Sequence, residues 1–248
     1  MKVGPTSYAI TGLGAIPPWV VNAGFIVGTR QTLIIDTGMN RLAAQTIHGY
    51  ATAVRPQNEL IVFNCEPHFD HIGGNGYFRE LGVDVYGHPD IQRTLSHFEA
   101  EKEDYNQSIT NVVRQSQRET EAFFVETGVV NPNCEAVGGH VFMLGEVEAE
   151  VIATPGHTSI NQSVYNRTDN VLFCADCLVK GYLPNLEPGT ETDWQNWLVS
   201  LERIQALSPD VIVPGHGNVI QNHEIQDEIV RTIGIVGEAL RQGKPPTR

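Results

Sequence analysis

The sequence predicts an α/β protein with a mixed sheet, and three observations carry this prediction. Short β-branched runs of strand length recur along the chain, and longer segments with apolar residues at helical spacing lie between and after them. This alternation favours helices packed on a sheet. The length of 248 residues and the hydrophobic content of 41% suit one large globular unit, so we expect a single domain over residues 1–248.

The elements of the first half follow from short apolar runs and the turn residues between them. A strand that ends in Asp-Thr-Gly precedes a polar, alanine-rich helix predicted over about residues 40–54. The loop between the first two strands has an unusually apolar tip, which contains Ile16 and Trp19. The strands predicted here are Ser7–Ile10, Asn22–Val27, Thr32–Gly38, Leu60–Phe63 and Val83–Tyr86.

The second half begins with a polar region and ends with two amphipathic helices. Residues of about 89–127 read as a solvated helical insertion, and a lid over the site is the alternative. Strands are predicted at Val141–Leu144, Glu148–Ala153, Ser163–Tyr165, Val171–Cys174 and Val211–Val213. Helices are predicted at Trp194–Leu207 and Glu224–Leu240.

Candidate metal ligands stand at the ends of four predicted strands. Glu66 and His68 follow Leu60–Phe63 at a spacing that points both side chains to one face, and Asp70 with His71 occupies the next turn. Three more candidates end later strand-like runs, namely His157, Asp176 and His216. Imidazole and carboxylate groups gathered from several strand ends predict a metal site.

The order of these residues resembles the metallo-β-lactamase superfamily, whose signature is His-x-His-x-Asp-His followed by a distant His, an acidic ligand and a final Gly-His. Six of the seven positions match, and Glu66 stands where the family has its first His. The resemblance implies an αββα sandwich of two mixed sheets flanked by helices. It also implies a first metal held by Glu66, His68 and His157, a second held by Asp70, His71 and His216, and Asp176 bridging them.

The resemblance further implies a hydrolase that uses two divalent metal ions and a metal-bound hydroxide to open a carbonyl substrate. Zinc is the metal expected first. The substrate would be a lactone, ester, thioester or β-lactam, and Asp70 would orient the nucleophile or take up its proton. Glu66 adds a negative charge, so we expect the hydroxide to form at higher pH than in an all-histidine site. A carboxylate is also a harder ligand than imidazole, which shifts the preference toward Mn or Fe.

Alternative functions rest on other residues. Cys177-Leu-Val-Lys180, followed by Asn185, is similar to the Cys-Leu-x-Lys segment of secreted zinc β-lactamases, so a β-lactamase proper would use Cys177 as a metal ligand and Lys180 to bind a substrate carboxylate. Ile16 and Trp19 would contact an apolar part of the substrate. An iron-dependent oxidoreductase of the same superfamily and a non-catalytic metal-binding module are the remaining alternatives.

Composition excludes some partners. With 16 basic against 29 acidic residues and a net charge of -13, the chain lacks the cationic surface that nucleic-acid binding needs. The first residues form no apolar signal segment and no apolar run is long enough to cross a membrane, so we expect a cytoplasmic protein with reduced cysteines. An exported protein from which a signal segment has been trimmed is the alternative. The expected partner is a small-molecule carbonyl compound, and a homo-oligomer is left open.

Overall fold

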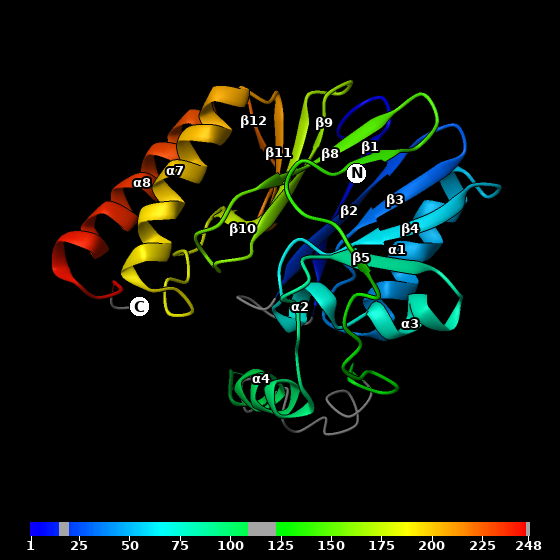
Figure 1. The fold of residues 1–248 in the computed structure, drawn as a ribbon, viewed down its shortest axis with the longest axis horizontal. Helices are drawn as coiled ribbons and strands as arrows, with labels where there is room; N and C mark the ends of the chain where they lie inside the picture. Colours follow the sequence, from blue (N-terminus) through cyan, green and yellow to red (C-terminus); the bar gives the residue numbers. More distant parts are fainter. Residues whose placement is uncertain (15–19, 109–122, 247–248) are drawn as a thin grey trace.

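The computed structural model describes residues 1–14, 20–108 and 123–246. Its strands form a curled mixed sheet in the order β6-β5-β4-β3-β2-β11-β10-β9-β8-β7, with β1 paired to β2 and β12 paired to β11. The sheet folds into two halves that meet where β2 pairs with β11 (Figure 1). The two predicted sheets are therefore continuous at this edge.

The N-terminal half contains the predicted early strands and three helices. Its strands are β1 (Ser7–Leu13), β2 (Val21–Val27), β3 (Gln31–Ile35), β4 (Glu59–Phe63), β5 (Asp84–Gly87) and β6 (Cys134–Glu135). Its helices are α1 (Arg41–Val54), α2 (Phe69–Ile72) and α3 (Asn75–Glu80). Asn40 caps α1 by accepting a hydrogen bond from the Ala43 backbone N–H, as the predicted helix start requires.

The C-terminal half contains the later strands and two long helices. Its strands are β7 (Val141–Met143), β8 (Glu148–Ala153), β9 (Gln162–Asn166), β10 (Val171–Val179), β11 (Val211–His216) and β12 (Ile220–Gln221). Its helices are α7 (Glu191–Leu207) and α8 (His223–Gln242). Thr190 and Asp193 form a reciprocal capping box that starts α7 three residues before the predicted position.

Three apolar clusters separate the layers of the fold. One lies between the two halves and joins residues such as Phe63 and Leu33 to Phe142 and Phe173. A second lies beneath α7 and α8, and a third lies beneath α1. In Figure 1 these helices cover the outer faces of the two halves. The arrangement is the predicted αββα sandwich.

Four strands that carry candidate ligands run in the same direction. β4 is parallel to β3 and β10 is parallel to β11, while β2 is antiparallel to both β3 and β11. Through β9, β8 also runs in the direction of β10. The carboxyl ends of β4, β8, β10 and β11 therefore lie at one edge of the sandwich, which is where ligands gather in open α/β sheets.

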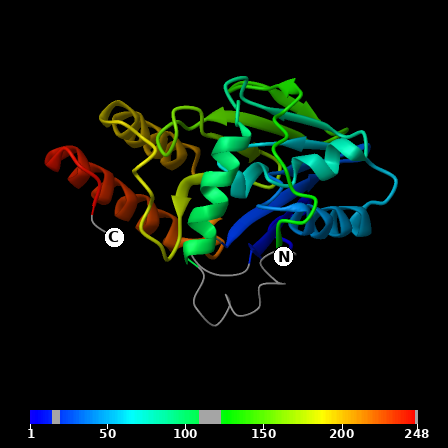
Figure 2. The ribbon, with the colours of Figure 1, turned by 90° about the horizontal axis from the view of Figure 1, so that it is seen from below.

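The described part of the predicted insertion contains α4 (Leu95–Ser108), and residues 109–122 of that insertion lie outside the described residues. Most of the charged side chains of α4 are accessible to solvent, but Phe98 and Tyr105 are buried with Phe69 and Phe124. Seen from below in Figure 2, α4 lies between the helices of the two halves. The helix is thus anchored on the segment that carries Asp70, rather than fully solvated as predicted.

Among the described residues, no helix is long and apolar enough to cross a membrane.

Candidate metal centre

The structure brings all seven predicted ligands together. Their ligand atoms form overlapping groups in which every atom lies within 4.8 Å of the others: Glu66, His68 and His157; Asp70, His71 and His216; and Glu66, His71 and Asp176. His216 ends β11, Asp176 lies within β10, and the other ligands follow β4 or β8. The convergence follows from the strand directions, because all four carboxyl ends lie at one edge.

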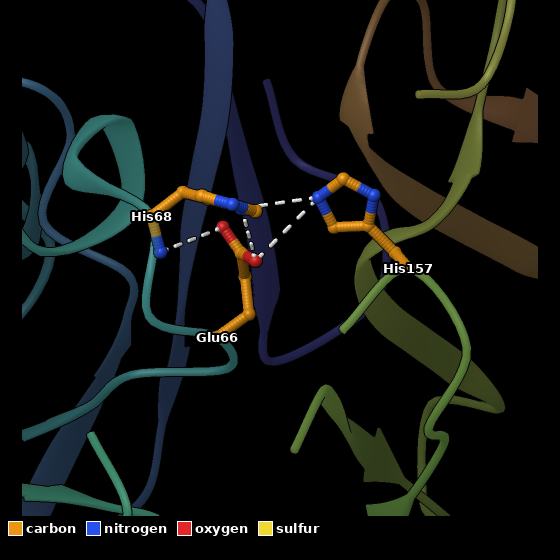
Figure 3. A group of neighbouring side chains, drawn as sticks. All are labelled: Glu66, His68 and His157. Atoms are coloured by element: carbon orange, nitrogen blue, oxygen red, sulfur yellow. Dashed lines mark hydrogen bonds and ion pairs between the residues drawn. The ribbon is translucent and has the colours of Figure 1, made fainter. Parts of the chain in front are cut away.

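The first group is drawn in Figure 3. The Glu66 carboxylate lies between the two imidazoles, with Oε2 2.8 Å from His68 Nδ1 and 3.7 Å from His157 Nε2. His157 Nε2 is itself 3.1 Å from His68 Nδ1. The other Glu66 oxygen, Oε1, accepts a hydrogen bond from the His68 backbone N–H at 3.2 Å.

The second group is arranged around Asp176. Its Oδ1 lies 3.3 Å from His216 Nε2 and 3.4 Å from His71 Nε2, while its Oδ2 lies 3.4 Å from His157 Nε2 of the first group. Asp70 Oδ2 is 3.3 Å from His216 Nε2 and 4.0 Å from His71 Nε2. Asp176 therefore faces both groups, as expected of a bridging ligand.

A local irregularity of β10 places Asp176. The pairing with β11 shifts register on both sides of Ala175, whose φ of 44° is in the left-handed region. β10 therefore continues past the predicted end at Cys174, and the Asp176 carboxylate packs directly against Gly215. A Cβ at Gly215 would overlap Asp176 Oδ1, so the Gly-His pair at this position is required by space as well as by ligation.

Partners behind the ligands fix the orientation of three imidazoles. His157 Nδ1 is 2.9 Å from the Asn185 carbonyl oxygen, and His216 Nδ1 is 2.8 Å from the Val20 carbonyl oxygen. Because a carbonyl can only accept, each Nδ1 carries the proton and each Nε2 is left with a lone pair toward the site. His71 Nδ1 makes the corresponding contact with Asp36 Oδ2 at 2.8 Å.

Asp36 therefore supports the ligands from behind. Its second oxygen accepts a hydrogen bond from the Cys65 backbone N–H, which ties the ligand-bearing segment to the end of β3. Burial raises the pKa of the Asp36 carboxyl, and the contact with His71 works against that rise. Asp36 is itself held at a φ of 59°, a backbone conformation that most side chains avoid.

The donor set fits divalent cations. His71 Nε2 and Asp176 Oδ1 are buried and have no hydrogen-bond partner among the described residues. Such atoms are costly to bury unless something else satisfies them. Imidazole nitrogens and carboxylate oxygens that converge without an intervening cationic side chain are the ligands that zinc, manganese and iron take in proteins.

The charges of the ligands also favour binding of divalent cations. Burial alone would raise the pKa of the Asp70 carboxyl, but His71 and His216 outweigh it and lower the pKa to about 2. Burial alone would lower the pKa of His71 and of His216, yet the facing carboxylates raise both well above the ordinary value. The facing carboxylates therefore favour positive charge on these two imidazoles, and a divalent cation would supply that charge in their place.

The ligand cluster forms the floor of a cavity of about 700 Å³, which five of the seven ligands line, while Glu66 and His71 are fully buried and do not line it. His68, Asp70 and Asp176 are among the floor residues, while α4 and the segment after β10 supply the wall. The wall includes Arg93, Glu101, Tyr182 and Asn185. This is large enough for a small organic substrate.

The structure separates the predicted substrate residues. Asn185 lines the cavity and its carbonyl orients His157. Lys180 does not line the cavity, and its Nζ pairs with Glu224 Oε1 of α8 at 2.8 Å. Ile16 and Trp19 lie outside the described residues.

Cys177 lies away from the seven ligands. Its side chain is fully buried in the apolar cluster beneath α7, and burial raises the pKa of the thiol to about 12. A thiol in these surroundings stays protonated and cannot ligate the second metal as the β-lactamase alternative requires. The cause is strand alternation, since Asp176 and its neighbour Cys177 point to opposite faces of β10.

Sequence reasoning missed Arg93 and Glu101. Arg93 forms an ion pair with Glu101, which also accepts a hydrogen bond from the Phe69 backbone N–H at 2.9 Å. The backbone of Arg93 is held in turn by Asn131, which bonds to both its N–H and its C=O. These contacts join segments that are far apart in the sequence, and no local sequence motif predicts them.

A family model described as the metallo-beta-lactamase superfamily matches residues 16–216. The chain is 24% identical over 207 residues to an acyl-coenzyme A thioesterase of Gallus gallus, which covers 80% of this chain and 73% of that protein. It is 22% identical over 210 residues to an atrochrysone carboxyl ACP thioesterase of Aspergillus fumigatus, covering 84% and 55% respectively. A type 2 metallo-beta-lactamase of Bacteroides fragilis is 23% identical over 211 residues, covering 84% and 72%.

Solved structures are similar in fold. A metallo-beta-lactamase from Pontibacter korlensis superposes with a TM-score of 0.68 at 18% identity, covering 96% of this chain and 97% of that chain. A metallo-beta-lactamase family protein from Thermus thermophilus gives a TM-score of 0.69 at 20% identity, covering 96% and 81%.

Proposed function

The chain belongs to the metallo-β-lactamase superfamily, and we propose that it is a dinuclear metal-dependent hydrolase of thioesters, esters or lactones. Family membership and the thioesterase and β-lactamase relatives support a metallo-hydrolase in general. The observation that carries the proposal is the convergence of seven ligands on the floor of a cavity large enough for a small substrate.

The residues of the floor have distinct parts in such a reaction. Two divalent cations held by the seven ligands would supply a water of lowered pKa and polarise the substrate carbonyl. Asp70 lines the cavity and its carboxyl stays ionised, so it can orient the attacking water and accept its proton. Asp36, Asn185 and Val20 keep the three imidazoles in the orientation that binds metal.

Two observations favour a thioester, ester or lactone over a β-lactam. Lys180, which would bind the carboxylate of a β-lactam, is already paired with Glu224. Cys177 is buried in the apolar core instead of lying beside Asp70 and His216. The names of the thioesterase relatives support the same choice, and a β-lactam remains the second candidate because of the Bacteroides fragilis relative.

Zinc is the metal we propose first. The Glu66 carboxylate favours harder cations than a histidine would, so manganese or iron is proposed as the alternative. A small-molecule carbonyl partner and a cytoplasmic location remain proposals from the sequence.

The test is hydrolysis by protein purified without chelator and loaded with Zn(II), Mn(II) or Fe(II). A short acyl thioester, a lactone and a chromogenic β-lactam are compared, and oxygen uptake is followed in parallel. We expect turnover of the thioester or lactone that is lost with chelator and restored by metal. Lys180→Ala is the matched control, and it should change this turnover less than about twofold because its partner is Glu224.

Three outcomes would overturn the proposal. Turnover of the β-lactam alone, abolished by Lys180→Ala, would show that the β-lactamase alternative is correct. Oxygen uptake with bound iron and no hydrolysis would favour the oxidoreductase, while metal binding with neither activity would favour a binding module.

A further inference from the structure

Glu66 has a position that a histidine at the same place could not reproduce. Its two carboxylate oxygens face different imidazoles: Oε2 is 2.8 Å from His68 Nδ1 and 3.7 Å from His157 Nε2, whereas Oε1 is 3.4 Å from His71 Nε2. His68 and His157 belong to the first ligand group and His71 to the second. A single side chain therefore presents one oxygen to each group.

Asp176 has the same relation to the two groups from the opposite half of the molecule. Its Oδ2 faces His157 of the first group and its Oδ1 faces His71 and His216 of the second. Glu66 comes from the segment after β4 and Asp176 from β10, so the two carboxylates enter from different halves of the sandwich. His71 Nε2 lies 3.4 Å from an oxygen of each.

From this arrangement we infer that Glu66 bridges the two metal positions, so that the pair of cations is held by two bridging carboxylates, Glu66 and Asp176. The hydrogen bond from the His68 N–H to Glu66 Oε1 is compatible with this role, because a carboxylate oxygen has two lone pairs. Glu66 is fully buried, and its ion pairs among the described residues are all with histidines. A buried carboxylate must be compensated by positive charge, and cations at the two positions would supply it.

A second bridge changes how the site takes up metal. Glu66 and Asp176 would each serve both positions, so loss of either carboxylate is expected to weaken metal binding at both. Bridging carboxylates also favour cations that prefer oxygen ligands, and Mn(II) is therefore a suitable probe as well as a candidate occupant.

The test asks whether Glu66 contributes to the second position when the first is disabled. In metal-free His157→Ala protein, Mn(II) is titrated and the free ion is followed by electron paramagnetic resonance. We expect one ion per chain, bound by Asp70, His71 and His216 together with the bridging carboxylates. Adding Glu66→Gln or Glu66→Asp should then weaken the binding of this remaining ion by about tenfold or more. The glutamine lacks the anionic oxygen that ligates the ion, and the aspartate side chain is too short to extend to the second position.

The two substitutions separate bridging from a mere charge effect. If Glu66 serves only the first position, both double variants keep the Kd of His157→Ala within about twofold, and the inference is wrong. If Glu66→Gln weakens binding but Glu66→Asp does not, the effect is one of charge, and the inference is equally overturned. Should His157→Ala fail to fold by circular dichroism, His68→Ala replaces it, since that residue also belongs to the first group alone.

These readings use no substrate, so they are independent of the proposed hydrolysis. A protein that binds two ions through Glu66 but hydrolyses no carbonyl compound would overturn the proposed function and leave the bridge intact. Turnover of a carbonyl compound, together with an unchanged Kd in both double variants, would support the proposed function and overturn the bridge.

Discussion

The floor of the cavity is built from the ends of four strands, whereas its wall is built from α4 and the segment that follows β10. On the floor, Glu66 and His71 are fully buried, and each imidazole but His68 is held from behind by a carbonyl or carboxylate oxygen. On the wall, Leu183 is 40% exposed, and the Arg93 side chain forms an ion pair with Glu101.

This difference separates two properties of the protein. The ligands of the floor are fixed by strand direction and buried hydrogen bonds, so we assign the metal chemistry to this region. The wall depends on side-chain contacts that are partly accessible to water, where ion pairs contribute little to stability. We therefore assign substrate choice to the wall, and the predictions below test that division.

Asp176→Ala is expected to have the largest effect, because Asp176 faces both ligand groups. Metal content should fall below one ion per chain and hydrolysis should become undetectable. Elemental analysis of the purified variant measures the first and the substrate assay the second. A folded variant that kept two ions would show that Asp176 is not a shared ligand.

Asp36→Asn tests the support behind the floor. The asparagine is uncharged and holds the His71 imidazole less strongly, so metal affinity should fall by about 10–100-fold although no ligand is removed. Competition with a metallochromic chelator measures this change. Replacing the exposed Asp90 by Asn is the control, and it should leave the affinity unaltered.

The pH dependence of metal binding follows from the raised pKa values of His71 and His216. Below those values both imidazoles are protonated in the metal-free protein, and a cation must displace the protons. Affinity should therefore rise with pH, by roughly tenfold per unit for each histidine that loses a proton, until the pH passes the raised pKa. Calorimetry in buffers of different ionisation enthalpy should detect the released protons. An affinity that stays constant between pH 6 and 8 would contradict this account of the site's charges.

Glu101→Gln should have a smaller effect that is confined to the wall. It removes the ion pair with Arg93 and weakens the contact with the Phe69 N–H, so α4 is held less firmly. We expect KM for the hydrolysed substrate to change by roughly three- to tenfold, about 1 kcal/mol, with metal content unchanged. Glu99→Gln, at an exposed position of the same helix, is the matched control. Loss of metal from Glu101→Gln would contradict the assignment of metal binding to the floor and of substrate choice to the wall.

The floor could be predicted from the sequence because its signals are local. Glu66, His68, Asp70 and His71 lie within six residues after an apolar run, and the distant ligands each end a strand-like segment. The αββα fold followed from the resemblance that these residues established, and the solved structures of similar fold confirm it. Element boundaries moved by a few residues where a cap or a paired strand extended them.

The wall could not be predicted, because its contacts join distant segments. Arg93 is positioned by Asn131, 38 residues away, and Glu101 reaches back to Phe69. The similarity of Cys177 and Lys180 to a known segment did not predict where their side chains lie, for a related reason. The turn of β10 at Ala175 and the position of Glu224 on α8 decide where those side chains lie, and neither is visible in a motif.

The most direct test of the central claim, that seven side chains on the floor bind a pair of divalent cations, is elemental analysis of the wild-type protein purified without chelator. The account predicts two ions per chain, both removed by dialysis against chelator and both restored by adding Zn(II) or Mn(II) back. Protein that stays metal-free, or retains a single ion at saturating metal, would contradict it.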